Sequence, residues 1–309
     1  MRNCRFSYVL IGVSIATLFF LIQRNSVSQS INFVGIPTPS SPLLPWTPEL
    51  EHAVTCLRTA FQDGTSFRAA YHWFYLPETT DKCSSKIATI LSMQEFVGEE
   101  PKFFIPTTSR NFTYKMLTLG VGHNLEAEEK IMKAHPGCTR YVGVDPDPKI
   151  NQDLVEKLGG KFLKHVVAVD DNIGVASLLG QGQAYNTVQT KRTSLINVIK
   201  EAELTDVIDV LIMDIEGAEF SIFLDMIESP QKYPVICQLN IEFHDAFANG
   251  PEALDIIDSF DKMALQSRYL LLKVTQYPCS KPVFNRSFFI NIKDEYCIKK
   301  YVSKLFTSA

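Results

Sequence analysis

The stretch Val207-Ile-Asp-Val-Leu-Ile-Met213, followed at once by Asp214-Ile-Glu-Gly-Ala-Glu219, decides the fold. Seven almost wholly apolar residues, rich in Val and Ile, are typical of a strand buried on both faces and indicate a parallel sheet. Such a strand cannot enclose three carboxylates, so Asp214, Glu216 and Glu219 are predicted at and just beyond its carboxyl end. Open α/β sheets bind their ligands at that edge. The acidic cluster therefore predicts a binding site.

Hydrophobic periodicity on either side of this stretch predicts a doubly wound, mostly parallel seven-stranded sheet. Strand-like runs alternate with helix-like stretches, which is the pattern of an α/β fold. The last two strand-like runs have no obvious helix between them and could form an antiparallel edge. The expected strands are 115–119, 141–144, 162–169, 207–213, 235–243, 269–274 and 288–292, and the expected helices are 125–134, 150–158, 194–202, 219–227 and 252–266.

The amino terminus predicts a transmembrane signal-anchor. Residues 6–22 form an uncharged apolar run, flanked by Arg2 and Arg5 before it and Arg24 after it. At about 1.5 Å per residue the run just spans a bilayer core, and it suits a thin membrane of the secretory pathway. A cleaved signal peptide is the alternative, and it would make the protein secreted. The charges favour a cytosolic tail at 1–5 and a luminal body, in the Golgi or the endoplasmic reticulum.

Composition bounds the rest of the chain. The 309 residues are 46% hydrophobic and 21% charged, which is ordinary globular composition, and the formal charge of −4 gives no reason to expect a nucleic acid partner. Residues 23–48 are rich in Ser and Pro and predict a semi-extended stem. Residues 49–110 predict a mostly helical extension, and the α/β domain is expected to occupy 111–309.

Two glycosylation acceptors agree with a luminal body. Asn111-Phe-Thr113 and Asn285-Arg-Ser287 both have the acceptor pattern. Asn285 is the better candidate, because the strand pattern places it in the loop before the last strand. The expected product is a membrane-bound glycoprotein.

Six cysteines follow the apolar run and allow 15 pairings, among which the sequence cannot select. Cys56 with Cys83, and Cys279 with Cys297, are the first pairs to test. Cys237 falls inside an apolar strand and also fits a buried thiol.

Motifs at the ends of the first three strands predict a cofactor site. The first strand ends in Leu119-Gly-Val-Gly-His-Asn124, where Gly120 and Gly122 let the backbone approach a ligand at a helix amino terminus. The second ends in Asp145, and an acid at that place commonly binds the ribose hydroxyls of an adenosine-containing cofactor. Asp170 follows the third strand, near the expected adenine, where an acid can accept a bond from the exocyclic amine. A solvated turn is the alternative for Asp170.

Asp145-Pro-Asp147 has a second interpretation. A carboxylate pair after an apolar strand is what a metal-dependent glycosyltransferase uses to hold Mg²⁺ or Mn²⁺ with a sugar nucleotide. Pro146 and Pro148 instead resemble a helix start with Asp147 as its cap. The glycosyltransferase interpretation also leaves the glycine loop unexplained, so we expect no metal site.

The fourth and fifth strands supply candidate catalytic residues. Asp214 is the strongest candidate of its cluster, whereas Glu219 fits the beginning of the next helix, where negative charge is favoured. The fifth strand ends in Glu242-Phe-His244, and alternation places Glu242 and His244 on one face, directed toward the same cleft as Asp214. A histidine with a pKa near neutral could remove a proton from a hydroxyl group.

These motifs resemble the FkbM-type methyltransferase family, which uses S-adenosylmethionine and mostly methylates hydroxyl groups. The resemblance covers roughly 114–292. Its most specific signature is Met213-Asp-Ile-Glu-Gly-Ala-Glu219, preceded by Thr193-Ser-Leu195 and followed by Ile241-Glu-Phe-His244. Gly120 and Gly122 match the cofactor loop of the family, and Asp145 matches its ribose acid. The chain departs from the family at Thr118, where an acid is usual, and at Asn124, where a glycine is usual.

The resemblance implies a class I, Rossmann-like fold in a divergent, membrane-anchored branch of the family. It implies methyl transfer from S-adenosylmethionine to a hydroxyl group. Together with the expected luminal body, this leads to the hypothesis that the acceptor is a glycan or a similar luminal molecule. His244 is the expected base, and Asp214 is the alternative base or orients the acceptor, with Glu242 beside them. The expected cofactor-binding residues are Gly120, Gly122, Asp145, Asp170, Asp214 and Glu216. An inactive methyltransferase fold that serves as a binding module is the remaining alternative.

Overall fold

The computed structural model describes residues 44–62, 66–107, 112–179, 185–244, 268–276 and 284–307, together with Ile256, Phe260 and Met263. All of them belong to one compact unit, Leu44–Ala309. The apolar run at 6–22, most of the stem, Asn111 and Cys279 lie outside the described residues. Within the described ranges, no helix combines the length and apolar character that crossing a membrane requires.

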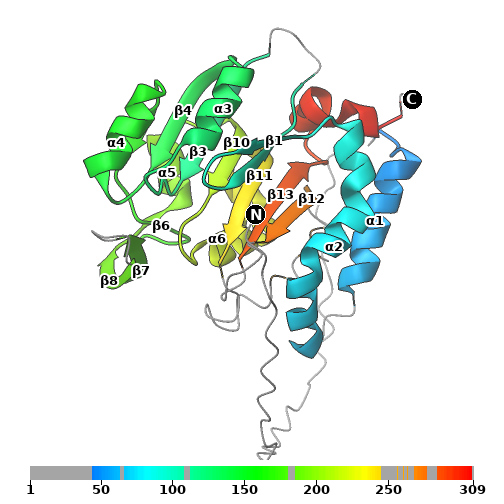
Figure 1. Ribbon diagram of the computed structural model, residues 1–309, viewed down its shortest axis with the longest axis horizontal. Coiled ribbons are helices and arrows are strands. Elements are labelled where there is room, and N and C mark those ends of the chain that lie inside the picture. The colour runs from blue at the N-terminus through cyan, green and yellow to red at the C-terminus, as the bar shows by residue number, and fades with distance from the viewer. Residues whose placement is uncertain are drawn as a thin grey trace, which may run out of the picture. The chain divides into compact units, whose positions relative to one another are not determined.

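A seven-stranded sheet forms the centre of this unit (Figure 1). Its strands are β3 (Tyr114–Leu119), β4 (Cys138–Val144), β5 (Lys161–Leu163), β10 (Val207–Met213), β11 (Val235–Phe243), β12 (Tyr269–Gln276) and β13 (Asn285–Asn291). The spatial order is β12-β13-β11-β10-β3-β4-β5. The strands from β5 to β11 are mutually parallel, and β13 runs antiparallel between β11 and β12. The predicted mostly parallel sheet of seven strands is confirmed.

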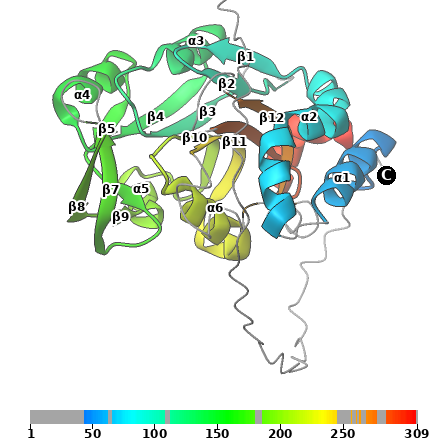
Figure 2. The ribbon, with the colours of Figure 1, turned by 60° about the horizontal axis from the view of Figure 1, so that its bottom comes forward.

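Period-two alternation in β10 explains why this strand is apolar throughout. Leu211 and Met213 pack into the hydrophobic core on one face of the sheet, whereas Val210 and Ile212 pack into the core on the other. Figure 2 shows α3 (Glu126–Ala134) and α4 (Pro148–Lys157) on one side of the sheet and α5 (Leu195–Glu201) and α6 (Glu219–Glu228) on the other. Burial on both faces is therefore what selects the Val- and Ile-rich sequence.

Register brings the carboxyl ends of four strands to one edge. Met213 of β10 is paired with Leu119 of β3 and with Ile241 of β11, and Leu119 is also paired with Val144 of β4. The residues that follow these positions are the glycine loop, Asp145, Asp214 and the Glu242–His244 segment. The topology thus gathers the predicted site residues at the ligand-binding edge of the sheet.

The amino-terminal extension contains two helices and a β-hairpin. α1 (Pro48–Phe61) begins with Thr47 as its cap and packs with α2 (Ser66–Ile90), which lies against β12. The hairpin follows as β1 (Gln94–Val97) and β2 (Pro101–Phe104). Two buried amides of β11 hold the strand β2 and the residue that follows it: Asn240 Oδ1 accepts from the amide of Phe103 at 2.7 Å, and Gln238 Oε1 accepts from that of Ile105 at 2.8 Å.

Two disulfides are present among the described residues. The predicted Cys56–Cys83 bond is confirmed, and it joins α1 to α2. Cys297 bonds to Cys237, so the predicted pairing of Cys297 with Cys279 is wrong and Cys237 is not a buried thiol. This bond joins β11 to the short helix α9 (Glu295–Cys297), two segments whose proximity depends on the finished sheet.

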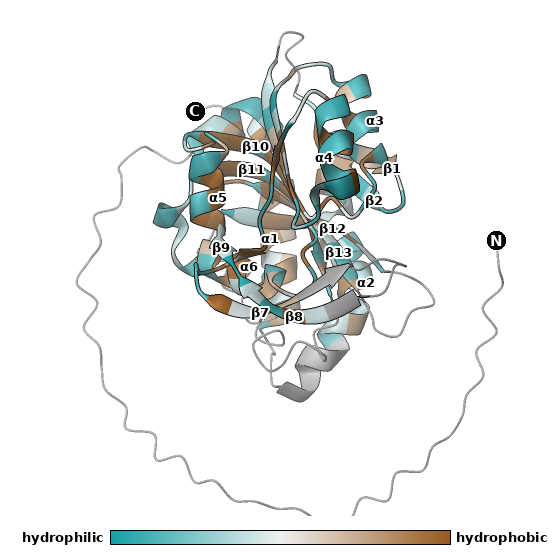
Figure 3. Ribbon diagram, turned by 90° about the vertical axis from the view of Figure 1, so that its left-hand side faces the viewer, coloured by the Kyte–Doolittle hydropathy of each residue, from teal (hydrophilic) through white to brown (hydrophobic). Residues whose placement is uncertain are grey.

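The expected strand at 162–169 is interrupted. Its beginning is β5, and its end is β6 (Val167–Ala168), which pairs with β9 (Thr193–Ser194) outside the main sheet. Between β6 and β9 the chain forms an unforeseen hairpin of β7 (Ile173–Leu179) and β8 (Tyr185–Lys191). Figure 3 shows the apolar strands β10 and β11 inside the fold and this hairpin at its surface.

Asn285 does not lie in a loop. It is the first residue of β13, and its side chain is fully buried. Its Nδ2 donates to the carbonyl oxygen of Trp73 at 3.1 Å, and its Oδ1 accepts from Gln276 at 2.8 Å. The prediction that Asn285 is an accessible glycosylation site is therefore wrong, because a glycan would need the nitrogen that this buried contact uses.

Candidate active site

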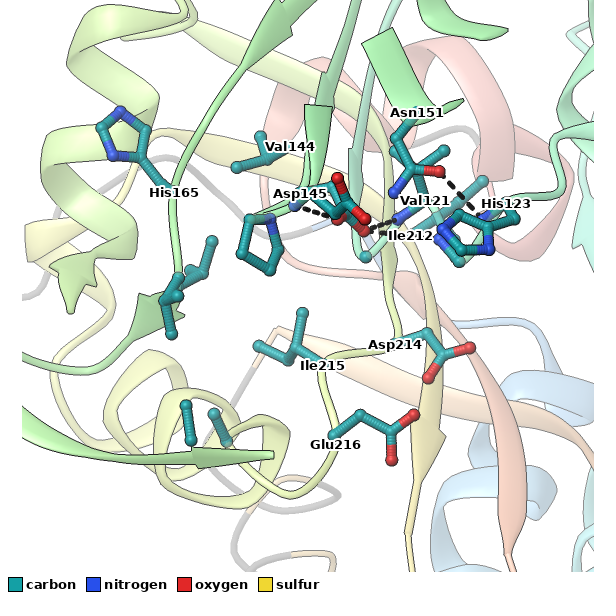
Figure 4. Close-up of a pocket in the computed structure, with 18 of the residues that line it drawn as sticks. Val121, His123, Val144, Asp145, Asn151, His165, Ile212, Asp214, Ile215 and Glu216 are labelled. Atoms are coloured by element: carbon teal, nitrogen blue, oxygen red, sulfur yellow. Dashed lines mark hydrogen bonds between the residues drawn. The ribbon is translucent and has the colours of Figure 1, made fainter. Parts of the chain in front are cut away.

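A cavity of about 1200 Å³ opens at the carboxyl edge of the sheet. Loops after β3, β4 and β10 form its floor, and the β1–β2 and β7–β8 hairpins contribute to its walls. Figure 4 shows Asp145 on one side of this space and the carboxylates of Asp214 and Glu216 on another. The predicted residues that line it are Gly120, Gly122, Asp145, Asp214 and Glu216.

The glycine loop after β3 requires its glycines. Gly120 and Gly122 have φ angles of +82° and +58°, in the left-handed region that glycine adopts readily. A Cβ atom at position 120 would collide with the carbonyl oxygen of Asp214, so the absent side chain lets two strand ends meet. This close approach places the loop and the acidic cluster in one site.

Asp145 shapes this loop as well as lining the cavity. Its Oδ2 accepts from the amides of Val121 at 3.0 Å and Gly122 at 3.4 Å, and its Oδ1 accepts from the amide of Asp147 at 2.8 Å. Asp147 in turn caps α4 by accepting from the amide of Lys149 at 3.0 Å. Backbone donors therefore engage both carboxylates of the suggested glycosyltransferase metal pair, and Pro148 opens α4 as expected.

Glu219 has a different role from a simple helix start. It begins α6, but its carboxylate is fully buried. Its Oε1 accepts from the backbone amide of His244 at 2.9 Å and contacts the ring Nδ1 at 2.8 Å, while its Oε2 accepts from the amide of Gly217 at 2.8 Å. The opposite ring nitrogen of His244 lies 3.1 Å from Glu216 and 3.6 Å from Asp214. His244 thus lies among three carboxylates.

This environment favours the protonated form of the His244 ring. Burial opposes the charge, but the hydrogen bonds to Glu216 and Glu219 raise the pKa of His244 to about 12. An imidazolium donates from both nitrogens and has no lone pair with which to accept a proton. His244 is also not among the residues that line the cavity. These contacts favour a fixed cation that orients neighbouring carboxylates, and the role of His244 as general base stays a prediction.

Asp214 has the properties that His244 lacks. It lines the cavity, and burial raises the pKa of its carboxyl to about 6, against the opposing effect of Lys102 and His244. A group with a pKa close to the working pH can both accept and release a proton, which suits a general base.

Glu242 is not among the residues that line the cavity. Arg286 Nε contacts one of its oxygens at 2.9 Å and Nη2 contacts the other at 3.1 Å, while Nη2 also contacts Glu100 at 2.5 Å. Burial and the nearby carboxylates of Asp214 and Glu100 raise the pKa of Glu242. Glu242 thus connects β11 through Arg286 to the β1–β2 hairpin, and its catalytic role stays a prediction.

Donor atoms of Asp214, Glu242 and His244 come within 4.8 Å of one another, a spacing that a metal ion could bridge. Two of these donors are already used. Both ring nitrogens of His244 face carboxylates, and both oxygens of Glu242 face Arg286. The donor atoms of His244 and Glu242 therefore form ion pairs and hydrogen bonds within the protein.

Asp170 does not line the cavity, contrary to the expected adenine contact. Its carboxylate accepts from Arg192 at 2.7 Å and from the side chain of Asn172 at 3.1 Å. The neighbouring Asp171 accepts from the amide and the hydroxyl of Ser194, both at 2.9 Å, at the start of α5. These two acids therefore organise the turn between β6 and the β7–β8 hairpin.

Several cavity residues were not foreseen. Glu99, Glu100 and Lys102 come from the β1–β2 hairpin, and Glu128 comes from the first turn of α3. Three glutamates in that turn look like a solvated face, yet Glu128 is only 3% exposed. Thr118 Oγ1 donates to Glu128 at 3.3 Å. Thr118 is the position of β3 at which the family usually has an acid, so the carboxylate of Glu128 from α3 lies beside that position.

The comparison with protein families identifies the domain. A family model described as the methyltransferase FkbM domain matches residues 92–267, more than half of the chain. The chain belongs to the FkbM methyltransferase family. The match begins just before β1, so it includes the hairpin that supplies Lys102. No curated protein matches the chain by sequence.

Solved structures with a similar arrangement are distant. The methyltransferase domain of METTL16 has 12% identity and a TM-score of 0.35, over 60% of this chain and 63% of that one. The FkbM methyltransferase from Methylobacillus flagellatus KT has 15% identity and a TM-score of 0.36, over 58% and 43%. The O-methyltransferase TomG from Streptomyces achromogenes, in complex with SAM, has 10% identity and a TM-score of 0.34, over 82% and 93%. This chain thus covers less than two thirds of the length of the first two.

The methyl donor of the family, S-adenosylmethionine, fits the residues of the cavity. Gly120, Gly122 and Asp145 lie where a nucleoside can be bound, and Val167, Val169 and Ile215 offer apolar surface. The carboxylates of Asp214 and Glu216 lie on the opposite side and complement a sulfonium charge. The FkbM domain is therefore a methyltransferase domain with S-adenosylmethionine as its cofactor.

Proposed function

We propose that this FkbM protein is an O-methyltransferase that acts on a hydroxyl of a glycan or a similar luminal acceptor. The observation that carries the proposal is the position of Asp214: its carboxyl lines the cofactor cavity, beside the glycine loop, with a pKa of about 6. A hydroxyl oxygen must lose its proton as it gains a methyl group, and a nearby carboxylate is a suitable acceptor.

Different residues of the site contribute to different parts of the methyl transfer, which is an in-line displacement. The bound cofactor supplies an electrophilic methyl group. Gly120 and Asp145 define the loop that holds the cofactor in place, and Asp214 accepts the proton of the acceptor hydroxyl. His244 fixes the carboxylates of Glu216 and Glu219. Alignment of the acceptor oxygen with the methyl group is the main contribution of such a site.

Transfer to neutral glycans tests the function directly. The full chain, incubated with methyl-labelled S-adenosylmethionine and a panel of uncharged oligosaccharides, is expected to place label in a methyl ether. Label on nitrogen would contradict oxygen as the acceptor atom. Binding of cofactor without transfer to any panel member would favour the inactive binding module.

The pH dependence of turnover should follow Asp214. Because burial raises the pKa of this carboxyl to about 6, the group is protonated below that pH and cannot act as a base. We expect turnover at saturating substrate to fall tenfold per pH unit well below 6 and to be level from about pH 7 to 9. If the residual turnover of Asp214→Asn still falls below about pH 6, a group other than Asp214 causes the pH dependence.

Replacement of Asp145 should weaken cofactor binding. Asp145→Ala removes an ionised hydrogen-bond acceptor for the ribose and also frees the amides of Val121 and Gly122. We expect the affinity for S-adenosylhomocysteine to fall by about 10- to 100-fold, measured by calorimetry. Asp153→Ala, an exposed change on the neighbouring helix α4, is the matched control. If Asp145→Ala binds S-adenosylhomocysteine as tightly as the unaltered chain does, Asp145 does not contribute to cofactor binding.

We further propose that the body is luminal and that residues 6–22 anchor it as a single-pass membrane protein of the secretory pathway. Two disulfides among the described residues support an oxidising compartment. Since Asn285 is buried, Asn111 is the remaining acceptor. Deglycosylation should reduce the mass of the expressed protein, and Thr113→Ala should abolish the shift while Thr113→Ser retains it. Access of a cytosolic protease to the carboxyl terminus would overturn this topology.

A further inference from the structure

Two residues of opposite charge line the cavity without a role in the proposed transfer of the methyl group. Lys102 comes from β2, and Glu128 comes from α3. Neither was visible as a site residue in the sequence. The side chain of Lys102 is 13% exposed, and Glu128 is 3% exposed. Charged groups are rarely buried to this degree without a partner that compensates them.

Their present contacts leave bonding capacity unused. Lys102 Nζ contacts Glu100 Oε2 at 3.3 Å, although an ammonium has three donors. Glu128 Oε1 accepts a long hydrogen bond from Thr118 at 3.3 Å, although a carboxylate offers about four acceptor positions. Both groups face the cavity, so a ligand can supply the missing partners.

The two charges also lie close enough to influence each other. Burial raises the pKa of Glu128, and Lys102 is the first of the groups that oppose this shift. Burial conversely opposes the charge of Lys102, whose pKa is nevertheless raised by Asp214, Glu100 and Glu128. Lys102 and Glu128 are thus neighbours on the wall that also carries Asp214.

S-adenosylmethionine has a zwitterionic end of matching chemistry. Its α-amino acid group carries one carboxylate and one ammonium on the same carbon atom. This end is joined through a short chain to the sulfonium, which Asp214 and Glu216 complement. A subsite for it must therefore lie near Asp214 and offer one cation and one anion, as this wall does.

We propose that Lys102 and Glu128 form the subsite for the α-amino acid group of the cofactor, Lys102 pairing with its carboxylate and Glu128 with its ammonium. The proposal rests on the cofactor assignment made above. Strand β2 delivers Lys102, and Arg286 holds its neighbour Glu100 together with Glu242 of β11. The hairpin at the end of the amino-terminal extension is therefore part of the cofactor site.

Three ligands that differ only at this end test the proposal in the full chain by titration calorimetry. S-adenosylhomocysteine has both charged groups, its decarboxylated analogue keeps only the ammonium, and 5′-methylthioadenosine has neither. Glu128→Gln should lower the affinity for the first two by about 10- to 100-fold and leave the third unchanged. Lys102→Met should lower the affinity for S-adenosylhomocysteine alone, by a similar factor.

Matched controls carry the same chemical changes elsewhere. Glu126→Gln alters an exposed carboxylate of the same helix α3, and Lys149→Met alters a lysine at the cavity rim near Asp147. Neither control should change the difference in affinity between S-adenosylhomocysteine and 5′-methylthioadenosine. Equal losses for all three ligands in the Lys102 and Glu128 variants would overturn the subsite, since they would report a distorted cavity. Unchanged affinities would overturn it too.

The same titration separates this proposal from the cofactor assignment. If the unaltered chain binds neither S-adenosylhomocysteine nor 5′-methylthioadenosine, the cofactor assignment fails and the subsite falls with it. If it binds both, the pattern in the variants decides the subsite alone.

Discussion

Asp214→Asn is expected to lower turnover by about 10²- to 10⁴-fold, as the loss of a general base does. The amide keeps the shape of the side chain but cannot accept the proton of an attacking hydroxyl. Asp214 lines the cavity, and His244 stays paired with Glu216 and Glu219 in the variant, so the fold should survive. Single-turnover methyl transfer at saturating donor measures the effect, with the exposed Asp153→Asn as control.

The same variant separates charge from shape at the sulfonium. Removal of a carboxylate should weaken the binding of cationic S-adenosylmethionine more than that of neutral S-adenosylhomocysteine. Equal losses of affinity for the two ligands would mean that Asp214 contributes only shape or hydrogen bonds. Retention of full turnover would show that another residue is the base.

His244→Gln is expected to destabilise the folded chain by about 3–5 kcal/mol, because it leaves buried carboxylates without their cation. Glu219 is fully buried and loses the ring contact of its Oε1, which keeps only the backbone amide at position 244, while Glu216 loses the contact at 3.1 Å. Denaturant unfolding measures the change. Glu219→Gln combined with His244→Gln should recover part of the loss, because the charge that lacked a partner is then absent.

The pH dependence of stability has a defined sign here. The folded pKa of His244, about 12, lies above the unfolded value of about 6.5. Its contribution is therefore complete below about pH 6.5 and is lost as pH rises toward 12. The unaltered chain should lose stability between these limits, and His244→Gln should lose less. A different outcome would identify His244 as the base. In that case His244→Gln would be as stable as the unaltered chain but inactive, and the fall in turnover near neutral pH that the unaltered chain shows would be absent from the variant.

The central sheet could be predicted because its signal is local. Val207–Met213 is apolar on both faces, and the loop of Gly120 and Gly122 follows its strand directly. Alternation of strands and helices then limits the possible topologies to a few. The same reasoning placed Asp147 correctly as the cap of α4.

The roles of the polar residues could not be predicted in the same way, because they depend on partners distant in sequence. Glu219 and His244 are 25 residues apart, and the contact that raises the pKa of the ring exists only in the fold. The alternation of residues along the strand places Glu242 toward the cleft, yet its carboxylate accepts a hydrogen bond from Arg286 of β13. Cys297 likewise meets Cys237 across a separation of 60 residues.

The hairpins escaped prediction for a related reason. β1 and β2 have only four residues each, and in β7 the apolar Ile173 and Val175 are exposed, the reverse of the buried apolar positions by which a strand is predicted. The β1–β2 hairpin is fixed by buried amides of β11, among them Asn240, which are not readable from its own sequence. Its contribution to the cavity, through Lys102, therefore became visible only with the fold.

Titration of the full chain with S-adenosylhomocysteine measures most directly whether the cavity at the edge of the sheet is a methyltransferase cofactor site. Saturable binding at one site per chain is predicted, weakened by Asp145→Ala and unaffected by Mn²⁺. Absence of binding at millimolar ligand would contradict the account. Binding of a nucleotide sugar that requires Mn²⁺ and is abolished by Asp147→Ala would contradict it in favour of a glycosyltransferase.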